Sequence, residues 1–332
     1  MQKPPFLILG SAAAEGVPAY FCDCRVCREA AARGGREIRG RTAYNFGGVL
    51  QIDFGPDMLQ AFQRHYPRLN AMRHLLVTHA HEDHLAPGEL WFRASGFSRL
   101  PADTPPLTIH GAPAVLDRLQ RGIAPTMRDR GRVLEMAHLA FHEIAPFQTF
   151  ELPDIGATVR TFPAKHAPGL EAMLFLITMG GRTVFIGNDT GFFPDELFDA
   201  LKALAGKVHV DIFVVDCCGA LLENYREFHM GADVNLELFA KLEQMGFIDS
   251  DTVKVANHFS HNAKATQRRT LRILRTEGRR RRLRRARTLT AAVNRWNHVD
   301  LYADFERRDA TDAHHEPVAS RRLARGTRLA SP

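Results

Sequence analysis

Short apolar runs, separated by glycine and proline, dominate the first 262 residues of the chain. Runs of this length bounded by turn residues predict β-strands, and we expect strands at 6–9, 49–54, 74–77, 107–110, 158–162, 172–178, 183–186, 211–215 and 253–256. Apolar residues at helical spacing predict helices over 58–65, 112–121, 194–203 and 234–245. Strands with helices between and after them indicate a layered α/β protein whose sheet is covered by helices.

The pattern changes after residue 262. Residues 279–287 read RRRRLRRAR, and the segment 263–332 holds 19 basic and 7 acidic side chains. The first 262 residues hold 25 basic and 30 acidic side chains, so the formal net charge of +7 arises in the tail. We therefore divide the chain into a globular domain at 1–262 and an atypical, Arg-rich tail at 263–332.

Several interpretations of the tail stay open. A dense positive patch could bind nucleic-acid phosphates, or the tail could be a disordered, solvated extension or a basic helix packed on the acidic body. Arg/Ala/Thr-rich sequence also results when a GC-rich coding region is read out of frame. We favour this artefact or an idiosyncratic extension, and we do not expect nucleic acid as a partner.

The chain carries no signal for a membrane or for secretion. No apolar run reaches the ~20 residues that span a bilayer, and the N-terminus MQKPPFLILG lacks the long apolar core and cleavage pattern of a signal peptide. We expect a cytoplasmic protein without a membrane partner.

Three of the five cysteines, Cys22, Cys24 and Cys27, lie within six positions. An odd number of crowded cysteines is not typical of a disulfide framework, and the spacing C-x-C-x₂-C lacks only one ligand for a tetrahedral structural zinc. We interpret the other two, Cys217 and Cys218, as small buried residues.

Four metal-ligand side chains follow the apolar run 75–77 within six positions: His79, His81, Asp83 and His84. Alternate residues of an extended backbone point the same way, so His79 and His81 can hold one ion. The chain turns before Asp83 and His84, which can then face a second ion. Imidazole and carboxylate are ligands that Zn²⁺ and Mn²⁺ accept. The segment therefore predicts a metal site where a buried strand ends.

The spacing H-x-H-x-D-H resembles the signature of the metallo-β-lactamase superfamily, and the resemblance extends along residues 1–262. It implies a four-layer αββα sandwich with two catalytic divalent ions, Zn or Mn. The first ion would be held by His79, His81 and His166, the second by Asp83, His84 and His258, and Asp189 would bridge them. The superfamily's early Asp corresponds to Asp53, for which we expect a role in orienting the ligands.

The cysteine cluster and the segment LGSAAAEGVP before it resemble one branch of that superfamily. This branch contains the phosphoribosyl cyclic-phosphate phosphodiesterases and the pyrroloquinoline-quinone biosynthesis protein B group. The resemblance implies His261 as fourth ligand of the structural zinc and His229 as general acid. Asp216 is either an orienting residue or a polar strand end, and His74 and His110 are interpreted as structural.

The resemblance implies a binuclear metal-dependent hydrolase, and we expect a phosphodiesterase that cleaves a small anionic cyclic or diester phosphate. The candidate catalytic residues are Asp83 and His229. A metal-bridging hydroxide would attack phosphorus, and His229 would protonate the leaving oxygen. A homodimer is a family expectation. Three alternatives stay open: a lactonase or other carboxylic-ester hydrolase on the same metals, a quinone-cofactor biosynthesis protein, and an RNA-processing nuclease.

Overall fold

Two six-stranded sheets form the body of the computed structural model, which describes residues 3–65, 71–125 and 129–266. The first sheet has the order β1 (Phe6–Gly10), β2 (Ala43–Phe46), β3 (Leu50–Ile52), β4 (His74–Leu76), β5 (Leu107–Gly111) and β6 (Leu139–Glu143). The second has the order β12 (Val253–Asn257), β11 (Ile212–Asp216), β10 (Arg182–Gly187), β9 (Met173–Met179), β8 (Ala157–Pro163) and β7 (Thr149–Leu152). The segment 267–332 lies outside the described residues, so the interpretations of the tail stay predictions.

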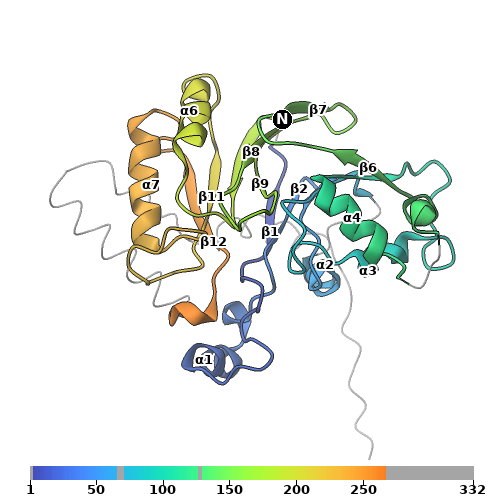
Figure 1. Ribbon diagram of the computed structural model, residues 1–332, viewed down its shortest axis with the longest axis horizontal. Coiled ribbons are helices and arrows are strands. Elements are labelled where there is room, and N and C mark those ends of the chain that lie inside the picture. Colours follow the sequence, from blue (N-terminus) through green and yellow to red (C-terminus); the bar gives the residue numbers. More distant parts are fainter. Residues whose placement is uncertain (1–2, 66–70, 126–128, 267–332) are drawn as a thin grey trace, which may run out of the picture. The chain divides into compact units, whose positions relative to one another are not determined.

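Helices cover the outer face of each sheet. The α-helices are α1 (Arg25–Arg33), α2 (Met58–His65), α3 (Pro87–Leu90), α4 (Pro113–Gly122), α5 (Val133–Met136), α6 (Asp195–Leu204) and α7 (Ala232–Gln244). Figure 1 shows α6 and α7 beside the second sheet and α2, α3 and α4 beside the first. Two helical layers around two sheets form the αββα sandwich that the sequence predicted.

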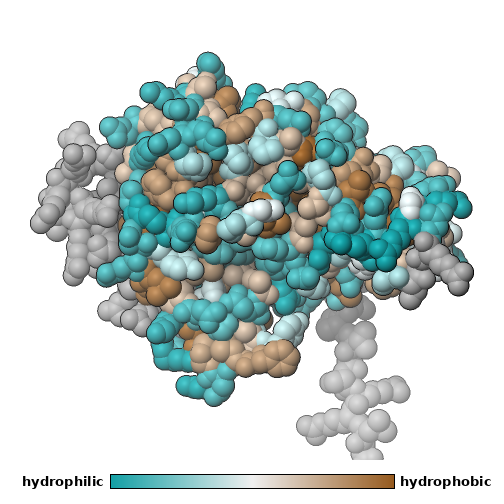
Figure 2. Space-filling model, in the orientation of Figure 1, coloured by the Kyte–Doolittle hydropathy of each residue, from teal (hydrophilic) through white to brown (hydrophobic). Residues whose placement is uncertain are grey.

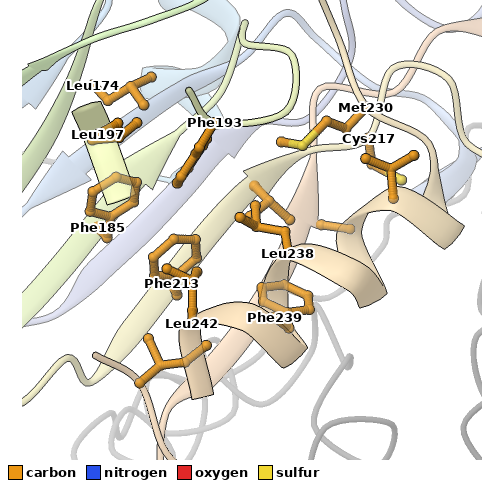
Figure 3. Packing of buried hydrophobic residues seen from close by; sticks show 14 of the residues in the cluster. Leu174, Phe185, Phe193, Leu197, Phe213, Cys217, Met230, Leu238, Phe239 and Leu242 are labelled. Atoms are coloured by element: carbon orange, nitrogen blue, oxygen red, sulfur yellow. The ribbon is translucent and has the colours of Figure 1, made fainter. Parts of the chain in front are cut away.

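The two outer cores have the same construction. In Figure 3, Leu238 and Leu242 of α7 lie over Phe213, and Leu197 of α6 lies near Phe185. The Phe185 and Phe213 rings stack with their centroids 4.4 Å apart. On the other side of the molecule, apolar residues of α2 and α4 pack against β4 and β5. Because such burial contributes roughly 25 cal/mol per Å² of apolar area, these helices anchor both sheets.

The strand directions bring the functional turns to one edge. Strands β3 to β6 are parallel to one another, and so are β10 to β12. The carboxyl ends of parallel strands meet at the same edge of a sheet, which is where ligands bind in such folds. The chain leaves β3 at Asp53, β4 just before His79, β10 just before Asp189 and β12 at His258. These turns carry most of the predicted ligands.

All nine predicted strands and all four predicted helices are present, with ends shifted by a few residues. The pattern missed β2, β6, β7, α1, α3 and α5, because their short or polar sequences carry little periodic apolar signal. Past the predicted boundary at 262, Ala263 and Ala265 are buried in the core that includes α7, so packed structure continues to the last described residues.

The described surface gives no sign of a membrane span. Figure 2 shows a face on which hydrophilic residues predominate and hydrophobic ones form separate smaller patches. None of the described helices is long and apolar enough to cross a membrane.

Candidate metal centre and active site

Three histidines form the first half of the candidate metal centre. Nε2 of His79 lies 2.9 Å from Nδ1 of His81, and Nε2 of His166 lies 3.2 Å from the same Nδ1. His79 and His81 follow β4, whereas His166 follows β8 of the other sheet. The close approach of one nitrogen from each ring is the arrangement needed to hold one ion.

Four side chains form the second half: Asp83, His84, Asp189 and His258, all buried. Nε2 of His84 lies 2.5 Å from Oδ2 of Asp189 and 3.1 Å from Oδ2 of Asp83. Nε2 of His258 lies 2.7 Å from Oδ1 of Asp189. The rings of His79 and His84 adjoin, with centroids 4.3 Å apart, so the two halves are neighbours. The structure thus brings together all seven ligands that the sequence resemblance implied.

Unpaired polar atoms test whether the second half fits a metal ion. Nε2 of His84 and Oδ2 of Asp189 are buried and make no hydrogen bond to any described partner, although they lie 2.5 Å apart. A buried polar atom without a partner costs free energy. When the His84 ring is neutral, with its Nδ1 hydrogen facing Asp53, its Nε2 and the Asp189 Oδ2 are two electron-pair donors that converge on one point. A divalent cation at that point would satisfy both atoms, so the residues fit the ions that the superfamily resemblance implies.

The backbone at this edge is held in an unusual conformation. Asp53, Asp189 and His258 have φ values of 58°, 50° and 59°. Non-glycine residues rarely occupy this left-handed region, and such positions cluster at functional sites because the surrounding structure must hold them there. All three residues directly follow or lie close after a strand, and Asp189 and His258 face each other in the metal centre while Asp53 faces the back of His84.

Partners behind the ligands fix the imidazole orientations. Nδ1 of His84 lies 2.6 Å from Oδ2 of Asp53, whose Oδ1 accepts from the Thr78 amide at 2.8 Å. The hydroxyl of Thr42 donates to the Ala12 carbonyl at 3.0 Å and lies 3.0 Å from Nδ1 of His258. Because that hydroxyl hydrogen is already used, Nδ1 of His258 donates and its Nε2 keeps a lone pair for an ion. Thr42 and Thr78 were not identified from sequence.

The charges of the second half are strongly coupled. Burial disfavours the charged form of His84, but the carboxylates of Asp189, Asp53 and Asp83 raise its pKa well above the usual value. Burial also opposes charge on Asp189, yet His258 and His84 lower its pKa far below the usual range. The site thus presents anionic oxygens to a cation.

His229 lies at the rim of the same centre, with Asp216 behind it. Nδ1 of His229 donates to Oδ2 of the fully buried Asp216 at 2.8 Å, and the other Asp216 oxygen accepts from the Met230 and Cys218 amides. Burial alone would lower the pKa of His229, but Asp216 and Asp189 raise it to about 9. Asp216 is therefore an orienting residue, and Nε2 of His229 is left for a ligand.

A pocket of about 370 Å³ opens over this centre. His81, Asp83, His166, Asp189, His229 and His258 all line it. The remaining walls come from loops, among them Glu15, Cys218, Leu222 and Tyr225. No sequence pattern marked this lining. We interpreted Cys217 and Cys218 as buried residues. Cys217 is buried, whereas Cys218 is partly exposed and lines the pocket.

The cysteine cluster closes onto His261. Nδ1 of His261 lies 3.4 Å from Sγ of Cys22 and 3.6 Å from Sγ of Cys24. Burial, together with neighbouring Cys24, raises the pKa of the Cys27 thiol to about 12. Adjacent thiolates need a cation beside them, so these four donors fit the structural zinc that the resemblance implied. The cluster joins the start and the end of the described chain: Figure 1 shows α1 beside the orange segment that follows β12.

A row of three further histidines, His74, His110 and His142, crosses strands β4 to β6 of the first sheet. His110 hydrogen-bonds His74 at 3.0 Å on one side and His142 at 3.0 Å on the other, and Nε2 of His74 lies 2.9 Å from Asp154. Each contact uses a different ring nitrogen, so these nitrogens do not converge on one point. The arrangement agrees with the structural role that we assigned to His74 and His110.

Comparisons with known proteins place this arrangement in context. A family model described as the β-lactamase superfamily domain matches residues 50–259. A ribonuclease Z from Mycobacterium marinum is 26% identical over an alignment of 167 residues that covers 48% of this chain. The matched segment covers 58% of that curated relative, a little over half of its length.

Solved structures of low sequence identity share the fold. A diphosphatase from the PhnP family is 20% identical with a TM-score of 0.55, covering 81% of this chain and 91% of that one. Zn²⁺-bound PqqB from Methylobacterium extorquens is also 20% identical, with a TM-score of 0.52 and coverage of 76% and 88%. Yeast PDE1 is 14% identical with a TM-score of 0.60, covering 85% and 96%.

Proposed function

The chain belongs to the β-lactamase superfamily, and from this premise we propose that it is a binuclear metal-dependent phosphodiesterase acting on a small phosphodiester or cyclic phosphate. The observation that carries the proposal is Asp189, whose two carboxylate oxygens face His84 and His258 at the floor of an open pocket. The likeness to a ribonuclease Z and to a diphosphatase agrees with phosphate chemistry.

We assign the ligands of each ion from the two groups of donors in the His/Asp centre. The first ion would be held by His79, His81 and His166, and the second by Asp83, His84, His258 and Asp189. The superfamily resemblance implies that Asp189 also reaches the first ion. Two such ions supply a water of lowered pKa and neutralise charge on the reacting phosphoryl group. Donors without sulfur suit hard ions and an oxyanion substrate, in Zn or Mn form.

His229 would protonate the leaving oxygen. Its Nδ1–H is held by Asp216, so the second ring nitrogen, Nε2, is the one available to a ligand in the pocket. The buried Asp216 carboxylate stabilises the charged imidazolium and keeps the ring from turning. Asp83 would act as a ligand of the second ion, and it also lines the pocket.

Metal content and hydrolysis together test the proposal. Inductively coupled plasma mass spectrometry of the purified protein should find about three metal ions per chain, two in the His/Asp centre and one in the Cys cluster. Protein that holds its metals should release p-nitrophenolate from bis(p-nitrophenyl) phosphate. His229→Asn should lower kcat and keep the metal content, because Asn cannot deliver a proton.

Parallel substrates separate the competing functions. We expect a lower kcat/KM for a lactone and for a tRNA precursor than for a small phosphodiester, and weaker binding of a quinone precursor. If metal-loaded protein opens the lactone and leaves every phosphodiester intact, the reaction class is wrong. If only the tRNA precursor is cleaved, the substrate is RNA rather than a small diester.

A further inference from the structure

The walls of the candidate active-site pocket carry their own chemical signature. Among the described residues that line it, none is Lys or Arg. Sites that bind an additional phosphate normally use such cations, because their charge-assisted hydrogen bonds are the strong ones. Apart from the His229 imidazolium at the rim of the metal centre, a phosphate bound elsewhere in the pocket would therefore meet no cationic side chain of the described lining.

Glu15 contributes a carboxylate to the same lining and is not one of the predicted catalytic ligands. Its Oε1 accepts from the Ser260 hydroxyl at 2.6 Å and from the Asn262 side-chain amide at 2.9 Å. Nε2 of His261 lies 3.5 Å from the same oxygen. These contacts all use Oε1, so within the described part of the chain the second carboxylate oxygen, Oε2, remains for a ligand.

The Cys cluster adjoins this carboxylate. His261 turns Nδ1 toward Cys22 and Cys24, and its opposite ring nitrogen faces Glu15. A carboxylate behind a histidine ligand is a common device for fixing the ring and its proton. Here the hydrogen bonds from Ser260 and Asn262, which flank His261 in the chain, hold the Glu15 carboxylate in the pocket wall.

The other walls are uncharged and partly apolar. Leu222 and Tyr225 line the pocket, and Gly219 makes room for the Tyr225 ring. A Cβ at Gly219 would lie only 2.4 Å from Cδ1 of that ring. A pocket that presents both an aromatic ring and a carboxylate suits a ligand ring that has apolar C–H bonds and hydroxyl groups.

We propose that the pocket selects a phosphodiester whose remaining part is an uncharged, hydroxyl-bearing ring, and that Glu15 is the specificity-determining residue that excludes a second phosphate. This inference rests on the proposed phosphodiesterase function. Like-charge repulsion inside a partly enclosed site acts against the wrong partner, which is how many sites gain specificity.

A matched pair of chromogenic substrates tests the proposal. One is the p-nitrophenyl ester of thymidine 5′-phosphate, and the other carries an additional 3′-phosphate in place of the hydroxyl. The holoenzyme should have a kcat/KM about tenfold or more higher for the first substrate. Glu15→Gln keeps the side-chain shape and the acceptor oxygen but removes the charge, and it should reduce this ratio to about threefold or less. The change should come mainly from the KM of the bisphosphate substrate.

Glu151→Gln is the matched control. Glu151 is an exposed carboxylate on β7 outside the pocket lining, so the same loss of charge there should leave the ratio unchanged. Zinc content of the Glu15→Gln protein must equal that of wild type, which shows that the effect does not pass through loss of the Cys cluster. If this variant does not fold, the salt dependence of the wild-type ratio replaces it: the ratio should shrink between about 0.05 and 1 M salt, because salt screens exposed charges.

Binding separates failure of this inference from failure of the proposed function. If neither ester is hydrolysed, the phosphodiesterase proposal is wrong, and calorimetry with thymidine 5′-monophosphate and thymidine 3′,5′-bisphosphate still measures the selectivity of the pocket. Weaker binding of the bisphosphate, relieved in Glu15→Gln, supports the role of Glu15. Equal or tighter binding of the bisphosphate by wild type, or a ratio that Glu15→Gln leaves unchanged, overturns it.

Discussion

The His/Asp centre and the Cys/His cluster differ in their donors and in their access to ligands. The Cys/His cluster has four donors, the number that completes a tetrahedral zinc site. The His/Asp centre has seven donors in two neighbouring groups, and most of them also line a pocket. A complete tetrahedron leaves no position for a substrate, whereas two ions that share a carboxylate retain open positions.

Chain connectivity reinforces this difference. Cys22 and His261 are 239 positions apart, so an ion between them ties the N-terminal loop to the end of β12. In the His/Asp centre, each half takes donors from both sheets. We infer that the first group serves mainly the stability of the fold and the second mainly its chemistry.

The largest expected effect comes from the shared carboxylate. Asp189→Asn removes the charge between His84 and His258, and losing only an orienting partner of a metal ligand already costs ~10–100-fold. We therefore expect hydrolysis of bis(p-nitrophenyl) phosphate to fall more than about 100-fold, with fewer ions per chain. Asp154→Asn, in the histidine row, is the control and should keep both. Full metal content in Asp189→Asn would contradict the assignment.

The next effect should appear in stability. Cys24→Ser removes one of four zinc ligands, and loss of a structural metal belongs to the changes that cost about 4 kcal/mol or more. Thermal unfolding should shift down by roughly 10 °C, while the metals of the His/Asp centre stay bound. A variant with unchanged thermal stability and reduced catalytic metal content would reverse the comparison of the two groups.

A smaller effect should appear in turnover alone. Asp216→Asn keeps the shape behind His229 but removes the charge that holds its Nδ1–H. We expect kcat to fall about 10- to 100-fold, with unchanged metal content by elemental analysis. Asp53→Asn, behind His84, should by contrast weaken metal binding. Loss of metal in Asp216→Asn would show that Asp216 belongs to the metal centre instead.

The smallest effect concerns the row of histidines, whose nitrogens do not converge. Burial, followed by the charges of His74 and His142, lowers the pKa of His110 to about 3. The unfolded value is near 6.5, so between these pH values the unfolded state binds more protons, and stability must fall as the pH falls below about 6.5. The loss through His110 should reach about 1.5 kcal/mol at pH 5.

Urea unfolding at pH 6.5 and pH 5 measures this dependence. His110→Gln removes the group that must stay neutral, so the variant should lose about 1.5 kcal/mol less than wild type over this interval. An equal loss in both proteins would show that His110 does not carry the dependence.

The predicted ligands could be identified from sequence because local signals mark them. His79, His81, Asp83 and His84 lie within six positions after a buried strand, and Cys22, Cys24 and Cys27 lie equally close together. More distant ligands such as Asp189 and His258 came from the superfamily resemblance and their place after strands. Thr42, Asp154 and Cys218 had no such signal, since their roles depend on neighbours that are distant along the chain.

The sequence by itself determined the ligand types, their order and the strands that present them, since apolar runs and close spacing are local properties. Only the tertiary structure decided which donors converge, because parallel strands from two sheets must meet at one edge before His166 reaches His81. It also decided the character of the pocket wall. Glu15 reaches its place because Ser260 and Asn262, some 245 positions further along the chain, lie beside it in the folded protein.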